Sequence, residues 1–142
     1  MKREFTQSFY KSAGAYACYA LCLIDVAEQY LGVTLSKDTS LECCIKYEYI
    51  YFNKKNYDDP DNFFVKRPEK VLECLTGKRW TVTKQDASYK PKPDEFAIEF
   101  WSYNDGKTGH FARTKNGFNS LQYSKSVREG KIVSYRICKV VA

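Results

Sequence analysis

The first half of the chain carries the apolar pattern of helices. Over residues 17–31 apolar side chains recur every three or four positions, and acidic and amide side chains fall on the other side. Gly32 is a natural end for this helix, because glycine adopts the left-handed backbone without strain. A second helix is expected after Ser36, a candidate N-cap, running toward Tyr51, although its aromatic end also suits a strand.

A polar loop and a third helix follow. Residues 53–62 are rich in Asn and Asp and contain a Pro, which together favour turns. Pro68 suits the first turn of a helix, where its missing N–H needs no partner. The pattern predicts that this helix runs through Leu75 and that Gly77 ends it.

After Gly77 apolar and polar residues alternate, which is typical of strands. In the second expected strand Phe96, Ile98 and Phe100 share one face, and Ala97, Glu99 and Trp101 share the other. Helices followed by an antiparallel sheet indicate an α+β domain and not alternating βαβ units. Five strands are predicted, over residues 79–83, 95–103, 109–114, 117–121 and 131–141.

Composition narrows the class of protein. The chain has 142 residues, of which 44% are apolar and 28% are charged, so it can bury a core and is not disordered over most of its length. We expect one domain over residues 1–142. No apolar run is long enough for a membrane helix and the first seven residues lack a signal peptide's apolar segment, so we expect a cytoplasmic protein that does not bind a membrane.

The six cysteines are expected to be reduced thiols. Without a secretion signal a disulfide framework is not favoured, and neighbouring Cys43 and Cys44 would strain a mutual bridge. A zinc site is also disfavoured, because the chain has one His and no C-x-x-C pair. We therefore expect no metal and no cofactor.

Positive charge is concentrated near the C-terminus. From Lys107 onward there are eight basic residues and one acid, a net charge of +7, whereas the whole chain carries +6 and the residues before Lys107 are therefore close to neutral. Such a segment could contact nucleic acid or an acidic partner. No helix-turn-helix, zinc-finger or RNP-like pattern accompanies the charge, so we favour solvent-facing strand positions and do not expect nucleic acid as a partner.

One pair of residues points to nucleophilic catalysis. His110 is the only histidine, it follows a glycine on a strand expected to be central, and any thiol that needs an imidazole base must use it. Cys18 lies at the expected start of the first helix, after a small, flexible approach at residues 12–15. The helix dipole there favours a thiolate, the nucleophilic form. Cys22, one turn on, is a weaker candidate because it lies deeper in the helix.

Two further side chains could complete the site. Gln7 could donate to a developing oxyanion together with the backbone N–H of Cys18. Asn119, nine residues after His110, could orient the imidazole across a hairpin. Asn116 and Asp105 compete for that role, but each precedes a glycine and suits a turn.

The order Gln, Cys at a helix start, His, then Asn resembles the papain-like cysteine peptidase superfamily, and more closely small bacterial papain-like domains of unassigned function. Ala17 stands where these relatives usually have Gly, and Asn119 where the smaller ones usually have Asp. The resemblance implies a papain-like α+β fold and a Cys-His-Asn triad. The matching segments are Gln7, Ala17-Cys18-Tyr19, Gly109-His110-Phe111, Asn119-Ser120-Leu121 and residues 124–137.

These residues predict a cysteine hydrolase acting on a peptide or isopeptide bond, with a peptide or protein as its substrate. Tyr19, Trp101 and Phe111 are candidates for an apolar substrate groove, although ordinary packing would explain them equally well. The alternative is a papain-like domain that no longer catalyses and instead binds a protein or an anionic partner. Ala17 and the small size favour that alternative.

Overall fold

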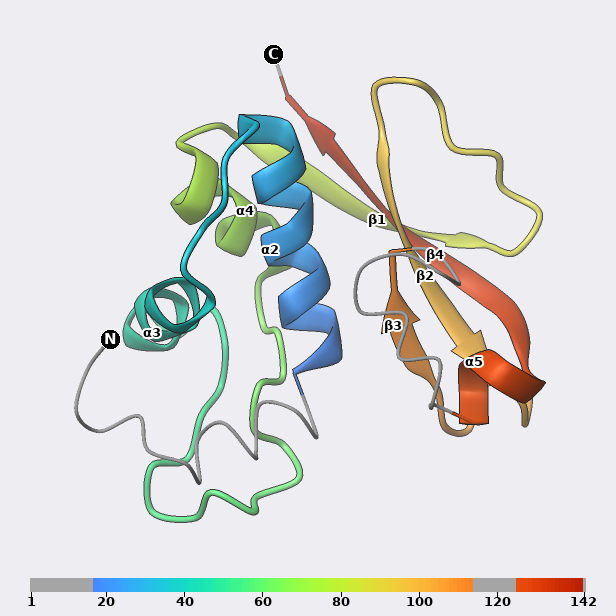
Figure 1. The fold of residues 1–142 in the computed structure, drawn as a ribbon, viewed down its shortest axis with the longest axis horizontal. Helices are drawn as coiled ribbons and strands as arrows, with labels where there is room; N and C mark the ends of the chain where they lie inside the picture. The colour runs from blue at the N-terminus through green and yellow to red at the C-terminus, as the bar shows by residue number, and fades with distance from the viewer. Residues whose placement is uncertain (1–16, 114–124, 142) are drawn as a thin grey trace. The chain divides into compact units, whose positions relative to one another are not determined.

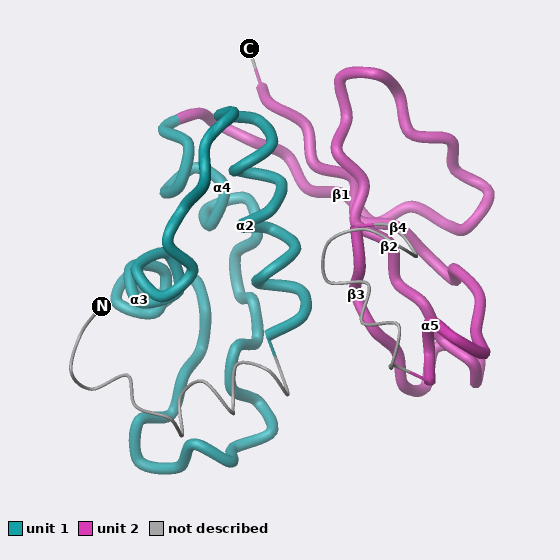
Figure 2. The backbone as a smooth tube through the Cα atoms, viewed as in Figure 1, with its two compact units in different colours: residues 1–77 teal, residues 78–142 magenta. Residues whose placement is uncertain are grey.

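The computed structural model describes residues 17–113 and 125–141. The chain divides into two compact units, unit 1 at residues 1–77 and unit 2 at residues 78–142 (Figure 2). Unit 1 is helical and unit 2 contains the sheet (Figure 1). The predicted α+β class is therefore confirmed. The prediction of one papain-like domain over residues 1–142 stays a prediction.

Helix α2, Cys18–Leu31, is the buried centre of unit 1. Leu23, Ile24 and Val26 are buried, and α2 packs against the two helices that follow it in residues 17–77. The helix ends where glycine was expected to end it, because Gly32 has the left-handed backbone with φ of 71° and its N–H donates to the carbonyl of Glu28.

Helix α3, Lys37–Lys46, begins as its sequence predicts. The Ser36 side chain accepts a hydrogen bond from the backbone N–H of Thr39 at 3.2 Å, which is the N-cap interaction. The helix does not continue toward Tyr51. Glu48 has a φ of 62°, outside the right-handed helical region, and the aromatic stretch forms only an isolated antiparallel bridge between Ile50 and Val65.

Residues 53–62 form the predicted polar loop, and Asn62 holds it together. Its buried side chain accepts from the backbone N–H of Asn53 at 2.7 Å and donates to the carbonyls of Asn56 and Tyr57. A single amide thereby links three backbone groups of the loop.

Helix α4, Pro68–Thr76, follows with Pro in its first turn and with left-handed Gly77 after its last residue, as predicted. Val71 and Leu72 are fully buried, and α4 packs against α2 and α3. These contacts complete the helical core of unit 1.

Unit 2 contains a four-stranded antiparallel sheet in the order β1-β4-β2-β3. Strand β4 therefore lies between β1 and β2 (Figure 1). Strand β3 ends this order within the described residues. The strand predicted at 117–121 lies outside them. The strands are β1 Trp80–Asp86, β2 Phe96–Ser102, β3 His110–Ala112 and β4 Lys131–Val140.

A bulge changes the pairing of β2 with β4. Phe100 pairs with Ser134, but the next residue, Trp101, pairs with Ile132, which leaves Val133 as the additional residue on β4. On the N-terminal side of the bulge, β4 begins at Lys131, which pairs with Ser102.

A short helix, α5 at Lys125–Glu129, precedes β4 and was not expected from the sequence. It packs against β2 and buries Val127. Gly130 joins the helix to the strand in a confined space, since an added Cβ would lie 2.1 Å from the carbonyl oxygen of Ser126 and 2.5 Å from that of Ser102. Over residues 17–113 and 125–141, no helix combines the length and apolar character needed to cross a membrane.

Candidate active site

Cys18 is the first residue of α2, where the sequence predicts it, and its side chain is half-buried. The preceding Ala17 cannot cap the helix with its side chain, and the first turn holds no acidic residue. The positive end of the helix dipole at Cys18 is therefore not offset by a carboxylate of its own helix. A thiolate is the charge state that such a position favours.

Ala17 fits its position without strain. Its φ of −94° lies in a region open to any residue, so the backbone does not require glycine there. The side chain is fully buried, which directs its methyl group into packing and away from solvent. Alanine in place of the glycine of the Gly-Cys pattern therefore has no cost in backbone conformation.

Four of the other five cysteines, Cys22, Cys44, Cys74 and Cys138, occupy less reactive positions. Cys22 is fully buried within α2. Burial raises the pKa of the Cys44 thiol and of the Cys138 thiol to about 12, and that of Cys74 to about 11. A thiol with so high a pKa is rarely a thiolate at neutral pH, which makes it a poor nucleophile.

His110 begins β3 in unit 2 and is 7% exposed. The backbone comes close to β2 just before it, because a Cβ added at Gly109 would lie 2.3 Å from Cζ of Phe100 and 2.6 Å from the carbonyl oxygen of Trp101. Only glycine allows this approach. Gly109 thus sets the position of the histidine on the sheet.

Trp101 is the cross-strand partner of His110, so these two side chains lie on one face of the sheet. Glu99, two residues before Trp101, lies on the same face and accepts a hydrogen bond from the indole Nε1–H at 2.9 Å. Burial raises the pKa of the Glu99 carboxyl, against the lowering effects of Trp101 and of the Arg113 charge. The strand alternation placed Glu99 beside Trp101, but Glu99 was not among the predicted site residues.

The predicted groove residues do not form one group. Phe111 contacts Phe100 with ring centroids 4.7 Å apart, and the Arg136 guanidinium lies 5.3 Å from the centre of its ring. These contacts belong to the opposite face of the sheet from Trp101, because neighbouring strand residues alternate. Tyr19 is half-buried on α2 in unit 1.

The remaining predicted site residues are not described by the structure. Gln7 and Asn119 both lie outside residues 17–113 and 125–141, as does the competing Asn116. Their roles in an oxyanion hole and in orienting the imidazole stay predictions. Asp105 is described, in a turn with a φ of 58°, which agrees with the expected turn role.

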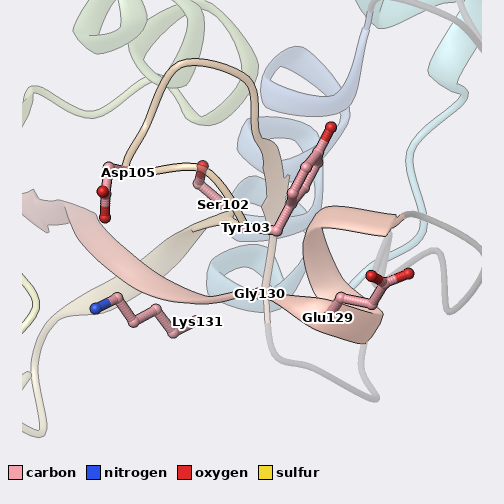
Figure 3. A pocket seen from close by; sticks show the side chains of 6 residues that line it. All are labelled: Ser102, Tyr103, Asp105, Glu129, Gly130 and Lys131. Carbon is pink, nitrogen blue, oxygen red and sulfur yellow. The ribbon is translucent and has the colours of Figure 1, made fainter.

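A polar pocket of about 290 Å³ opens beside this turn (Figure 3). In that view Asp105 and the ammonium of Lys131 lie on one side and Glu129 on the other. The pocket is lined by Ser102, Tyr103, Asp105, Glu129, Gly130 and Lys131.

The Ser102 hydroxyl in this pocket is fully committed to its own loop. It donates to the carbonyl of Thr108 at 2.6 Å and accepts from the backbone N–H groups of Asn104 and Gly106. A hydroxyl with both its proton and its lone pairs engaged is a structural group. These hydrogen bonds give Ser102 a structural role in the connection between β2 and β3.

A second pocket, of about 410 Å³, lies in unit 1 beside the polar loop. It is lined by Tyr51, Asp61, Phe64 and Lys66, and the Phe64 side chain is 64% exposed. Tyr51 is held by a hydrogen bond from its hydroxyl to Asp59 at 3.0 Å, which raises the pKa of the phenol. Neither this pocket nor the polar one is lined by Cys18 or His110.

Several basic residues of the C-terminal third make contacts within unit 2. The Arg113 guanidinium donates to the carbonyl of Ala97 at 2.9 Å, and Lys139 forms an ion pair with Asp94 at 3.3 Å. Lys125 lies over the Tyr103 ring, 4.6 Å from its centre. No group of three or more His, Cys, Asp or Glu side chains in the described residues is arranged to hold a metal ion.

Comparison with known proteins places the chain in a family but not in a function. No curated protein and no solved structure matches it. A family model described as "Protein of unknown function, DUF261" matches residues 3–140, which is almost the whole chain. The protein therefore belongs to the DUF261 family.

Proposed function

We propose that this protein is a cysteine hydrolase that cleaves a peptide or isopeptide bond, with Cys18 as the nucleophile and His110 as its acid and base. The observation that carries the proposal is the position of Cys18 at the start of a 14-residue helix, with neither a side-chain cap nor a first-turn acid beside it. The thiols at Cys22, Cys44 and Cys138 are buried, and the raised pKa of Cys74 makes it a poor nucleophile. Cys43 is as accessible as Cys18 but lies inside α3 and not at the start of a helix, which favours Cys18.

The proposed reaction has two halves. The Cys18 thiolate attacks the substrate carbonyl carbon, and the carbon–nitrogen bond breaks as the His110 imidazolium gives its proton to the leaving amine. His110 then takes a proton from water, whose oxygen attacks the acyl-enzyme and releases the acid and the thiolate. Gln7 and Asn119 are the proposed oxyanion donor and ring-orienting residue.

Cys18 belongs to unit 1 and His110 to unit 2, so their pairing is the part that needs an experiment. We would measure the pH dependence of iodoacetamide alkylation at Cys18, site by site, by peptide mapping of the native protein. An activated pair should give an apparent pKa below about 7, which returns toward about 8.5 in His110→Ala. Circular dichroism of each variant checks that the fold is retained.

A second variant guards against misfolding, because His110 is buried. His110→Gln keeps a polar side chain of similar size, and it should lose the activated thiol to the same extent. If Cys18 in the wild type alkylates like an ordinary thiol, or only in urea, the hydrolase proposal fails. A papain-like binding module then becomes the better hypothesis.

A positive result would justify a search for turnover. Activated esters are suitable first substrates, because an acyl-enzyme that forms faster than it hydrolyses gives a burst of the alcohol product. The acyl group should be found on Cys18 by mass spectrometry and should be absent in Cys18→Ser.

A further inference from the structure

Three thiols meet where α3 packs against α4 in unit 1. The Sγ atoms of Cys43 on α3 and Cys74 on α4 are 3.3 Å apart, and both thiols act electrostatically on the neighbouring Cys44 thiol. Cys43 and Cys74 are 31 residues apart in sequence, so only the packing of the two helices brings them together. None of these residues belongs to the proposed active site.

The two sulfurs are close to bonding distance. A disulfide has a length of about 2.05 Å, so a shift of roughly 1.3 Å between the sulfurs would suffice. Rotation of two side chains at a helix–helix contact can supply such a shift without moving the backbone far. Cys74 is exposed and Cys43 is half-buried, which leaves the pair open to a small reagent from solvent.

We propose that Cys43 and Cys74 form a reversible disulfide by exchange with a low-molecular-weight disulfide of the glutathione type. Cys74, the more exposed of the two, first loses its proton to solvent, and the small thiolate fraction attacks the reagent, breaks its sulfur–sulfur bond and releases one small thiolate, which takes up a proton. Cys43 then attacks the Cys74 sulfur of this mixed disulfide and releases the second thiol. Two protein thiols and one disulfide thus become one protein disulfide and two small thiols, with no other oxidant needed.

Cys44 is the third thiol of the cluster, but it is not the disulfide partner. Its side chain is 1% exposed, whereas Cys43 has solvent access. A bridge between the adjacent Cys43 and Cys44 would be strained. Burial above all, with the electrostatic influence of the neighbouring Cys74 and Cys43, raises the pKa of Cys44 to about 12, so it stays protonated.

The same environment makes the reaction slow at neutral pH. Burial and the hydrogen bond with Cys43 raise the pKa of the Cys74 thiol to about 11, so little of it is a thiolate at pH 7. The Cys43–Cys74 disulfide therefore forms in response to a sustained change in the surrounding thiol–disulfide ratio and not in response to a brief one.

The test is an equilibrium titration of the full-length native protein with mixtures of reduced and oxidised glutathione. After acid quenching and alkylation of the free thiols, peptide mapping should show a Cys43–Cys74 cross-linked peptide and a loss of about 2 Da, from two hydrogens. Dithiothreitol should reverse it. Cys43→Ser and Cys74→Ser should each reduce the cross-link to background, and Cys44→Ala and Cys138→Ala should retain it.

Three outcomes would overturn the proposal. One is a wild-type protein that stops at a glutathione mixed disulfide on Cys74 under the most oxidising mixture. Another is a cross-link through Cys44 in place of Cys43, and the third is a cross-link seen only after urea unfolding. Because Cys18 takes no part, the result is independent of the proposed hydrolase activity.

Discussion

Glu99 is a side chain of the sheet whose carboxyl has a pKa different from its value in water. Its carboxyl is held at one oxygen by the Trp101 indole at 2.9 Å, but half-burial on the sheet face outweighs that interaction and raises the pKa. The same carboxylate helps to raise the pKa of the Tyr135 phenol, after burial of that ring. The charged form of Glu99 is thus disfavoured by folding.

This predicts a pH dependence of stability. The folded pKa of Glu99 lies above the ordinary value of 4.5, so the folded state binds more protons than the unfolded state as pH rises through that range. The contribution of Glu99 to the free energy of unfolding therefore falls with rising pH. Glu99→Gln keeps an acceptor for Trp101 and should become more stable relative to wild type between pH 4 and pH 7, measured by urea unfolding.

Glu95→Gln is the matched control with the opposite sign. The backbone N–H of Lys92 and the Tyr89 hydroxyl donate to the Glu95 carboxylate and lower its pKa. Glu95 should therefore stabilise the fold above pH 4.5 and lose this effect as pH falls. If the two variants show the same trend with pH, burial does not control the ionisation of Glu99.

At the residue scale, the sequence predicts where a residue lies in its helix or strand better than it predicts which side chains that residue contacts. The start of a helix at Cys18 and the shared face of Glu99 and Trp101 both follow from local periodicity. The contact between Cys43 and Cys74 does not, because it depends on which helix faces pack together. Periodicity indicates that a helix face is apolar, but it does not indicate which other helix packs against that face.

At the scale of elements, pairing of β2 with β3 depends on the close approach at Gly109. Gly109→Ala places a Cβ against the Phe100 ring and the Trp101 carbonyl. We expect it to lower the free energy of unfolding by about 1–3 kcal/mol, the usual cost of overpacking. Urea unfolding measures the loss, and amide exchange should increase first at residues 99–101 and 110–112, which form the pairing.

Lys107→Ala is the control for this variant, because that side chain is exposed in the same connection. It should change stability by no more than about 0.5 kcal/mol. Equal losses in the two variants would mean that the connection as a whole, and not the contact at position 109, limits stability.

Element boundaries were predictable where a residue has a definite backbone preference. Ser36, Pro68 and Gly77 each mark the helix end that the sequence assigned to them. The aromatic stretch after Lys46 was ambiguous because its side chains suit both helix and strand, and positive φ at Glu48 decides against helix. Helix α5 was missed because its five residues are too few to show a period.

At the scale of the molecule, each unit has a core of its own. Leu72 is fully buried in the helical unit and Ile98 in the sheet unit. Strand order within the sheet could not be read from alternation, which assigns faces and not neighbours. Alternation also carries no information on whether Cys18 and His110 are neighbours, so their pairing stays a prediction.

Because each unit has its own core, we expect a core substitution to destabilise mainly the unit that carries it. Leu72→Ala and Ile98→Ala should each cost about 2–5 kcal/mol, as cavities in packed cores do. Amide exchange should rise mainly within the unit that carries the substitution. Val33→Ala, at an exposed position, serves as the control. A uniform rise across residues 17–113 and 125–141 for both core variants would show instead that the units unfold as one.

The sheet order has a consequence for the nascent chain. Strand β1 pairs with β4 and not with β2, and β4 is the last of these strands in sequence. Residues 80–86 leave the ribosome long before residues 131–140, so β1 waits without its partner strand while the helical unit can already fold. During that interval the unpaired backbone groups of β1 are open to wrong pairing and to chaperones.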